Sequence, residues 1–305
     1  MRQTLGPIDD RDYHREYRMS LEDVAAAYDA IAPDYDRQLA GDEWMRRTLW
    51  SRYDRLFRSG EKVLDVSCGT GTDALYLAGR GVHVTAIDVS PGMIAQLQAR
   101  LAQHELAKAI DARAMDMAGM GGFSPESFDG IISAFGGLST TPDLAHFASG
   151  AARLLRPGGR MVLHMLNRTS LWEWLGLAKR GEWAAARRLG KSGERDFVIG
   201  GIAVRHHLYH PEEAYRRFFA RDFVLKDARG LGCLRPPHTV RRVPLPVVET
   251  LGRLELVVSR RRPFLNWGRF FVLELAKRDK RGEFRPGLSD GPDVSDGLAR
   301  IIADG

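Results

Sequence analysis

The feature that most restricts how this chain can fold is a glycine-containing turn early in the sequence. Residues 63–66 are apolar apart from Asp65, as expected of a buried strand, and they run directly into Ser-Cys-Gly-Thr-Gly-Thr at residues 67–72. Glycine adopts left-handed backbone conformations without strain and lets a ligand approach the backbone closely. A helix that starts after such a turn presents free N–H groups to that ligand. The segment therefore predicts a strand, a turn at Gly69 and Gly71, and a helix, together binding a nucleotide-like cofactor.

Apolar runs of strand length alternate with stretches of helical periodicity as far as residue 166. Strands are predicted at residues 62–66, 82–88, 111–115, 128–134 and 160–166, and helices at 73–80, 91–104 and 141–155. Strands that alternate with helices form parallel sheets whose two faces the helices cover. Further strands are predicted at 223–228 and 270–276, with helices at 211–219 and 247–257. This pattern predicts an α/β fold.

The segments around this core indicate one domain, residues 21–278, with less regular ends. Residues 1–20 have no apolar run, so they are predicted to be flexible and not to form a signal peptide. Residues 21–58 have helical spacing behind a cap at Ser20 and are predicted to form cap helices. The alternation stops after residue 167, so 168–205 is predicted to be an inserted helical lid. Residues 279–305 are rich in Gly, Pro and Asp and are predicted to be a loose tail.

Two acidic residues narrow the choice of cofactor. Asp88 closes the second predicted strand, where a carboxylate can accept hydrogen bonds from both hydroxyls of a ribose. Glycines followed by such an acid also match the fingerprint of dinucleotide-binding enzymes, so a nicotinamide-dependent oxidoreductase is one alternative. Asp65 lies within the first strand and puts negative charge where a pyrophosphate would otherwise bind, so it favours a cationic ligand. S-adenosylmethionine fits both acids, with its ammonium at Asp65 and its ribose at Asp88.

At these residues the chain resembles a known family. Residues 63–165 resemble a class I S-adenosylmethionine-dependent methyltransferase of the small-molecule branch, which includes the ubiquinone and menaquinone C-methyltransferases and the glycine N-methyltransferases. Besides the glycine turn, the motifs that carry the resemblance are Ile-Asp-Val-Ser-Pro-Gly-Met at 87–93, Met-Asp-Met at 115–117 and Leu-Arg-Pro-Gly-Gly at 155–159. The resemblance implies a Rossmann-like seven-stranded sheet with helices on both faces and a final antiparallel strand pair.

The resemblance also implies which residues bind the adenine ring. Val89 and Met93 would be the apolar residues that clamp the ring. The Asp116 carboxylate would accept a hydrogen bond from the adenine amino group, and the backbone N–H of Met117 would contact the ring. Asp88, the residue predicted to bind the ribose, lies between these residues and the glycine turn in the sequence. The predicted adenosine site thus draws on the ends of the second and third strands. No metal site is predicted.

At the methionine end, the resemblance implies Ala134 along the cofactor and Tyr35 in an N-terminal helix that closes over it. Methyl transfer from a sulfonium is an in-line displacement, so positioning supplies most of the catalysis and a base is optional. If a base is used, His207 and Tyr209 are the candidates, because family members close their acceptor pocket from this region. Both would lie on one face of an extended segment.

The acceptor is narrowed by what the sequence lacks. Ser-Ala-Phe-Gly at 133–136 lacks the Asn/Asp-Pro-Pro-aromatic element that base amino-methyltransferases use on a flipped base. No DNA partner is therefore expected, and RNA is disfavoured. We expect a small-molecule acceptor that is apolar, aromatic or lipid-like. A non-catalytic S-adenosylmethionine-binding scaffold protein remains an alternative.

Composition bears on the compartment and on a further partner. The chain has two cysteines, Cys68 and Cys233, too few for a disulfide framework, so a reducing compartment and hence the cytoplasm is expected. No apolar window approaches the length of a membrane span. The predicted lid carries tryptophans and basic residues between 171 and 191. This pattern is typical of a lid packed on the core, and also of a surface that touches a membrane or an anionic lipid.

Overall fold

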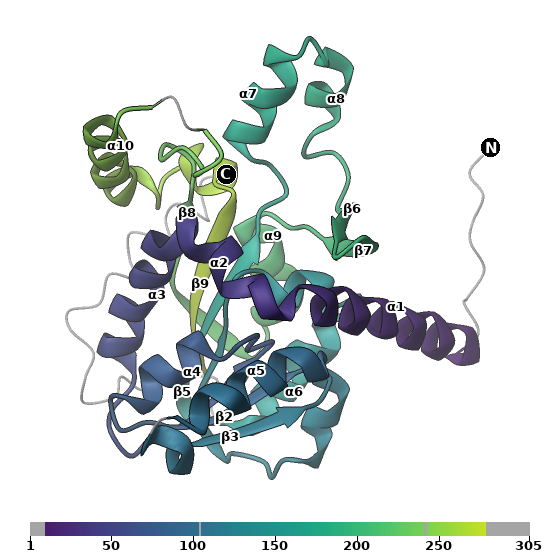
Figure 1. The fold of residues 1–305 in the computed structure, drawn as a ribbon, viewed down its shortest axis with the longest axis vertical. Helices are drawn as coiled ribbons and strands as arrows, with labels where there is room; N and C mark the ends of the chain where they lie inside the picture. The colour runs from purple at the N-terminus through teal and green to yellow at the C-terminus, as the bar shows by residue number, and fades with distance from the viewer. Residues whose placement is uncertain (1–9, 104, 241–242, 279–305) are drawn as a thin grey trace.

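The computed structural model describes residues 10–103, 105–240 and 243–278. Its centre is a seven-stranded sheet in the order β3-β2-β1-β4-β5-β9-β8 (Figure 1). The five strands β3, β2, β1, β4 and β5 pair in parallel. Strand β9 lies between β5 and β8 and is antiparallel to both. The strands are β1 (Lys62–Val66), β2 (His83–Asp88), β3 (Ile110–Ala114), β4 (Phe128–Ser133), β5 (Leu155–Leu166), β8 (Phe223–Leu231) and β9 (Phe270–Lys277). The predicted Rossmann-like sheet with a final antiparallel pair is confirmed.

Helices cover both faces of the sheet because successive strand residues point to opposite sides. Val63 packs with α3, α4 and α5, whereas its neighbour Leu64 packs with α6 and the turn after α9. Strands buried on both faces are typical of parallel sheets. The helices in these layers are α3 (Glu43–Leu56), α4 (Thr72–Ala78), α5 (Pro91–Leu101), α6 (Leu144–Leu154) and α9 (Pro211–Ala214), which continues as a π-helical turn at Tyr215–Phe219.

The remaining elements lie outside the two layers. Helices α1 (Asp10–Ile31) and α2 (Tyr35–Leu39) precede the core, and α10 (Leu245–Val258) and α11 (Phe264–Trp267) lie between β8 and β9. The insertion after β5 contains α7 (Leu171–Lys179), α8 (Trp183–Arg188) and the hairpin β6 (Glu194–Ile199) to β7 (Ile202–His207). Figure 1 shows α7 and α8 projecting from the body of the molecule, with the hairpin beside α1. No helix in the described ranges combines the length and apolarity that a membrane span needs.

Several predicted boundaries and one predicted element type differ from the structure. Helix α1 begins at Asp10, so the predicted cap at Ser20 is wrong, and residues 10–20, which were predicted to be flexible, belong to that helix. Strand β5 begins at Leu155, because Leu155 already pairs with Phe128 before a bulge in the ladder. The insertion is not purely helical, since residues 194–207 form the β6–β7 hairpin. Residues 1–9 and 279–305, which include most of the predicted loose ends, lie outside the described residues.

Candidate functional site

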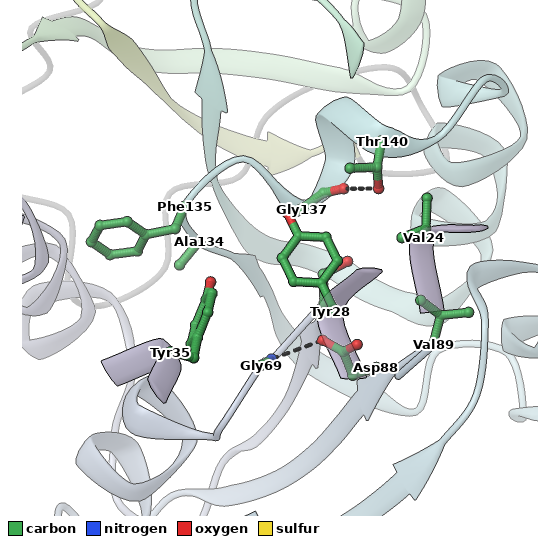
Figure 2. Close-up of a pocket in the computed structure, with 11 residues that line it drawn as sticks. Val24, Tyr28, Tyr35, Gly69, Asp88, Val89, Ala134, Phe135, Gly137 and Thr140 are labelled. Atoms are coloured by element: carbon green, nitrogen blue, oxygen red, sulfur yellow. Dashed lines mark hydrogen bonds between the residues drawn. The ribbon is translucent and has the colours of Figure 1, made fainter. Parts of the chain in front are cut away.

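The main pocket lies where the carboxyl ends of β1, β2, β3 and β4 meet, beneath α1 and α2. It consists of two adjoining cavities with about 390 Å³ and 320 Å³ of empty space, one of which is drawn in Figure 2. Ligands of open α/β sheets bind at this edge, because the loops that follow the strands converge there. Both cavities are lined by Val24, Ser67, Asp88, Val89 and Thr140.

The glycine turn forms the floor of this pocket. Gly69 has a φ of +56° and lines the pocket, and a side chain there would press against the ring of Tyr35. Gly71 has a φ of +76° but does not line either cavity. A Cβ atom at Gly71 would lie 2.3 Å from Cδ1 of Leu97, so this glycine is needed for the contact between the turn and α5. Gly69 therefore lets a ligand approach the backbone of the turn, whereas Gly71 lets the turn pack against α5.

Asp88 joins the end of β2 to the glycine turn. Its Oδ2 accepts a hydrogen bond from the backbone N–H of Gly69 at 2.8 Å, and its Oδ1 accepts one from Ser90 N–H at 2.9 Å (Figure 2). The carboxylate lines both cavities and is 9% exposed. Burial raises the pKa of Asp88 to about 6, although these hydrogen bonds act in the opposite direction. Asp88 is thus held in place and faces the pocket from its midpoint.

Asp65 is the most unusual charged group near the pocket. It is 1% exposed, and neither carboxylate oxygen has a hydrogen-bond partner among the described residues. Burial and the nearby charge of Asp73 raise its pKa well above the ordinary value. Asp65 does not itself line either cavity, but Ser67, two residues further on, lines both. A buried carboxylate without a partner is costly, so a ligand cation at this end of the pocket would be stabilised.

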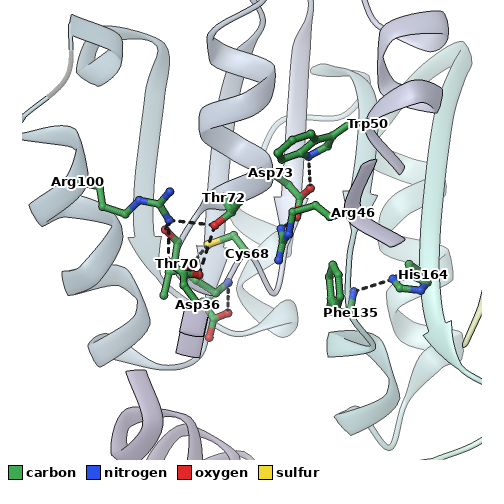
Figure 3. Close-up of polar contacts among 12 residues, drawn as sticks. Asp36, Arg46, Trp50, Cys68, Thr70, Thr72, Asp73, Arg100, Phe135 and His164 are labelled. Atoms are coloured by element: carbon green, nitrogen blue, oxygen red, sulfur yellow. Dashed lines mark hydrogen bonds and ion pairs between the residues drawn. The ribbon is translucent and has the colours of Figure 1, made fainter. Parts of the chain in front are cut away.

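Arg46 of α3 is a site residue that the sequence did not reveal. Its guanidinium forms an ion pair with Asp73 and lies 4.4 Å from the ring centroid of Phe135 (Figure 3). Asp73 also accepts a hydrogen bond from Nε1 of Trp50 at 2.8 Å. The charge of Arg46 lowers the pKa of Asp65, against the larger effect of burial. The guanidinium of Arg46 and the carboxyl group of Asp65 therefore lie behind the residues that line one end of the pocket, and neither lines a cavity itself.

Two aspartates fix the helices that cover the pocket. Oδ1 of Asp29, in α1, accepts hydrogen bonds from the Ser90 hydroxyl at 2.5 Å and from Gly92 N–H at 2.7 Å. Asp36, in α2, accepts a hydrogen bond from the Thr70 hydroxyl. Its Oδ2 also forms an ion pair with Nη1 of Arg100, at 3.2 Å (Figure 3). Both helices are thereby attached to the loops that carry the ligand-facing residues.

Tyr28 of α1 and Tyr35 of α2 line the pocket from above. Their rings meet edge to face, with centroids 6.3 Å apart. Burial raises the pKa of Tyr28 to about 12 and raises that of Tyr35 further, so both phenols are neutral at physiological pH. Tyr35 lies over Gly69, as expected for a helix that closes the pocket.

The residues predicted to contact adenine separate into two groups. Val89, Asp116 and Met117 line the cavity at the ends of β2 and β3. Oδ1 of Asp116 accepts a hydrogen bond from Gly119 N–H at 2.9 Å and caps a short 3-10 turn. Met93 lies elsewhere: it is fully buried in α5 and lines neither cavity. Its packing position makes it part of the core under the pocket.

At the opposite end, the segment after β4 forms the wall. Ala134, Phe135 and Gly137 line the pocket, and Phe135 has a left-handed φ of +51°. The backbone N–H of Phe135 donates to Nδ1 of His164 at 3.2 Å (Figure 3). Burial, with nearby arginine charges, lowers the pKa of His164 well below its ordinary value, so the imidazole is neutral. His164 thus positions the left-handed turn at Phe135.

Neither predicted base faces the main pocket. Tyr209 is buried in the core against Phe218, and His207 lies 3.7 Å from Glu194 at the base of the hairpin. The insertion contributes no residue to the lining of the main pocket; instead, Val204 of its hairpin packs on Val24 and Ala27 of α1. Across the described residues, no group of three side chains is placed to hold a metal ion.

The comparisons with known proteins agree with this arrangement. Residues 63–159 match the model of a family described as a methyltransferase domain. The match begins at β1 and ends within β5, so it spans the glycine turn, Asp88 and the segment after β4. This segment of the chain is therefore similar to a methyltransferase domain. The cap helices, the insertion and the final antiparallel strands lie outside the matched residues 63–159.

Curated relatives match part of the chain. A demethylmenaquinone methyltransferase of Clavibacter sepedonicus is 33% identical over 144 residues, which are 46% of this chain and 56% of that protein. A ubiquinone biosynthesis O-methyltransferase of Xylella fastidiosa is 40% identical over 111 residues, 36% of this chain and 44% of that protein. The chain therefore spans only about half the length of these relatives.

Solved structures extend the likeness beyond the methyltransferase domain, at the level of the fold. The cyclase SpnF superimposes with a TM-score of 0.56 at 17% identity, covering 84% of this chain and 95% of that one. A 1,6-didemethyltoxoflavin-N1-methyltransferase of Burkholderia thailandensis has a TM-score of 0.52 at 19% identity, covering 90% and 94%. At these identities the likeness shows the fold alone.

Proposed function

We propose that this chain binds S-adenosylmethionine in the main pocket and transfers its methyl group to a small-molecule acceptor. The observation that carries the proposal is the buried Asp65, which has no hydrogen-bond partner among the described residues. A cationic ammonium would supply that partner, whereas a pyrophosphate would be repelled. The methyltransferase domain and the relatives that share it support the same cofactor.

The charged groups around the pocket suit the parts of this cofactor. Asp65 would pair with the ammonium of its methionine end, and Arg46 with the carboxylate of the same end. Asp88 would accept hydrogen bonds from the ribose hydroxyls, since its carboxylate faces both cavities. Val89, Asp116 and Met117 would enclose the adenine, and Tyr35 would cover the ligand from α2. Met93 would contribute from the core, and not by contact, because it does not line the pocket.

When bound, S-adenosylmethionine supplies an electrophilic methyl group, and the chain's own residues then have to position the acceptor and exclude water. Ala134, Phe135 and Gly137 form the wall at the end of the pocket where the methyl group would lie. An in-line displacement needs the acceptor atom within about 3–3.5 Å of the methyl carbon. No titratable side chain among those lining this end is placed as a base. We therefore favour positioning over base catalysis, with His207 and Tyr209 as untested candidates.

A small, aromatic or lipid-like acceptor is supported by the names of the relatives, two of which refer to quinones. The insertion exposes Trp183 and Leu175, and exposed apolar side chains of this kind can contact a membrane or lipid. DNA and RNA acceptors receive no support from the pocket, which residues of α1 and α2 partly cover. Both cysteines are free, which is consistent with our proposal of a cytoplasmic location.

Two other functions must be separated from this one. A non-catalytic scaffold would bind S-adenosylmethionine without methyl transfer, and one solved neighbour of this fold is named a cyclase, so the fold itself does not dictate the reaction. A nicotinamide-dependent oxidoreductase would bind NADH in the same pocket. These alternatives differ in the ligand bound and in the fate of the methyl group.

The deciding experiment has two stages. Isothermal titration should show that S-adenosylhomocysteine binds and NADH does not; the reverse result would reject the proposal. The protein is then incubated with methyl-labelled S-adenosylmethionine and a small-molecule extract, with the Asp65→Asn variant as control. We expect labelled product only with the wild-type protein. Binding without any labelled product across extracts and a panel of phenols, quinols and amines would favour the scaffold.

A further inference from the structure

A second cavity lies apart from the main pocket. It holds about 220 Å³ of empty space between the start of α3, the start of α7 and the loop that follows β8. It shares no lining residue with the main pocket. We call it the Trp44–Trp172 cavity, and its lining consists of Asp42, Trp44, Met45, Trp172, Gly232, Arg235, Pro236, Pro237 and Arg269.

The cavity combines flat aromatic surface with a cation that is not neutralised by a carboxylate. The guanidinium of Arg235 lies 4.9 Å from the ring centroid of Trp44. Among the described residues no ion pair to Arg235 is present, whereas Arg269 is paired with Asp42. A Cβ atom at Gly252 of α10 would lie 3.0 Å from Nη1 of Arg235, so the glycine makes room for the guanidinium. An arginine stacked on tryptophan in this way is well suited to a planar anion.

Two polar atoms in the lining lack partners. Asp42 is 3% exposed, and its Oδ1 has no hydrogen-bond partner among the described residues; Nδ1 of His238 lies 3.8 Å from it, and Arg269 is paired with the other oxygen. Nε1 of Trp172 is likewise buried without an acceptor among the described residues. Buried donors and acceptors are nearly always paired in native proteins, and each exception needs an explanation. A ligand with a hydroxyl group could donate to Asp42 and accept from Trp172.

Hydrogen bonds to a buried glutamate of α10 fix the loop that carries Arg235. Glu255 of α10 is fully buried, and its carboxylate accepts hydrogen bonds from Gly232 N–H at 2.7 Å and from Leu234 and Arg235 N–H at 2.8 Å each. Charge-assisted hydrogen bonds to backbone amides are strong and directional. The cavity wall is therefore organised before any ligand arrives, which lowers the entropic cost of binding.

The cavity lies next to the end of the main pocket where the methyl group would be. Met45 lines the cavity, and the next residue, Arg46, lies over the ring of Phe135. Arg269 lines the cavity, and the next residue, Phe270, packs on Phe135 with ring centroids 6.2 Å apart. Phe135 also lines the main pocket, so Arg46 and Phe270, which each follow a residue that lines the cavity, contact a residue of the main pocket.

We propose that the Trp44–Trp172 cavity binds a planar, anionic part of the methyl acceptor. The identification of the ligand as the methyl acceptor rests on the proposed function. The chemistry of the ligand is inferred from the cavity alone. Arg235 binds the anionic group, Trp44 and Trp172 contact the ring, and Asp42 with Nε1 of Trp172 binds a hydroxyl substituent. The acceptor class that follows is an aromatic acid or a comparable hydroxylated ring anion.

The test measures binding of 4-hydroxybenzoate and of its neutral counterpart 4-hydroxybenzamide to the full chain by nuclear magnetic resonance titration. We expect the acid to bind at least tenfold more tightly than the amide. Arg235→Gln should remove this preference, while Arg253→Gln, on the exposed side of α10, should keep it. Equal binding of acid and amide, or an unchanged preference in Arg235→Gln, would overturn the proposal.

Further variants separate a local effect from misfolding. Arg235→Lys keeps the charge without the planar guanidinium and should retain part of the preference for the acid. Trp172→Phe keeps a ring but removes the Nε1–H, so it should reduce the advantage of 4-hydroxybenzoate over benzoate. In all of these variants the affinity for S-adenosylhomocysteine should be unchanged. If wild-type protein fails to bind S-adenosylhomocysteine, the proposed function fails, and the acid-against-amide comparison still judges the cavity.

Discussion

The hydroxyl of Thr70 donates a 2.6 Å hydrogen bond to Oδ1 of Asp36, which attaches helix α2 to the glycine turn. Thr70 is buried within the turn, and Asp36 directly follows Tyr35, the residue that covers Gly69. This contact, together with the ion pair between Asp36 and Arg100, links the covering helix to the backbone that a ligand would meet. The position of Tyr35 depends on a pair of residues that are separated by 34 positions in the sequence.

This contact predicts the effect of removing Asp36. Asp36→Ala should weaken binding of S-adenosylhomocysteine about fivefold, since a hydrogen bond to a partly exposed charge contributes on the order of 1 kcal/mol. The matched control is Asp34→Ala, which removes a carboxylate whose ion pair within the described part of the chain is to the exposed Arg37 in the same segment. Isothermal titration of both variants is the measurement. Equal affinities for the two variants would show that Asp36 does not hold α2 over the ligand.

The raised pKa of Asp88 predicts how cofactor binding depends on pH. The carboxylate must be ionised to accept hydrogen bonds from both ribose hydroxyls, and its pKa in the ligand-free protein is about 6. Below that pH the proton has to leave before the ligand binds, so affinity for S-adenosylhomocysteine should rise as pH increases through 6 and level off above it. The Asp88→Asn variant should bind weakly with no such rise. Titrations at pH 5, 6 and 7.5 measure it, and a flat wild-type profile would contradict the assigned role.

Much of the fold could be predicted because it is specified by local patterns. Strand β1 ends where the apolar run meets the glycine turn, and the alternation of strands and helices fixed which loops share one edge of the sheet. The β6–β7 hairpin was missed although Gly200 and Gly201, both with positive φ, form the kind of two-residue turn that joins antiparallel strands. In that case a usable signal was present in the sequence.

From local pattern alone, the candidate site was predictable where its residues follow strand ends; Tyr35, on helix α2, was predicted from the family resemblance. Asp88 and Gly69 lie at such positions, and the structure brings them together. Arg46 and Trp172, by contrast, lie on helices, and their neighbours are distant in the sequence; the partner of Arg46 is 27 positions away. Nothing in a helical pattern distinguishes a side chain that points to a pocket from one in solvent. These residues become visible only when packing is known.

The buried Asp65 predicts a trade between stability and binding. Its pKa in the folded protein is raised well above the ordinary 3.8, so its favourable contribution is present below about pH 4 and is lost as pH rises through the folded-state pKa. Asp65→Asn should therefore raise the melting temperature of the ligand-free protein at pH 7.5 relative to wild type, with a smaller gain at pH 4. It should also weaken binding of S-adenosylhomocysteine at least tenfold, because the partner of the ammonium is lost. Thermal scans at both pH values, followed by titration, measure the two effects; a variant less stable than wild type at pH 7.5 would contradict this account.

The buried Glu255 predicts a large loss of stability when its side chain is removed. Its buried carboxylate accepts three backbone hydrogen bonds from the loop after β8, and Glu255→Ala would leave those N–H groups without partners. We expect a loss on the order of 3–5 kcal/mol in the free energy of unfolding, measured by urea denaturation. Glu249→Ala, on the exposed face of the same helix, should change it by less than about 0.5 kcal/mol. Because the loop carries Arg235, a fold-retaining Glu255→Gln variant should also weaken binding of 4-hydroxybenzoate while leaving that of S-adenosylhomocysteine unchanged. Similar unfolding free energies for the two alanine variants would mean that Glu255 does not hold the loop.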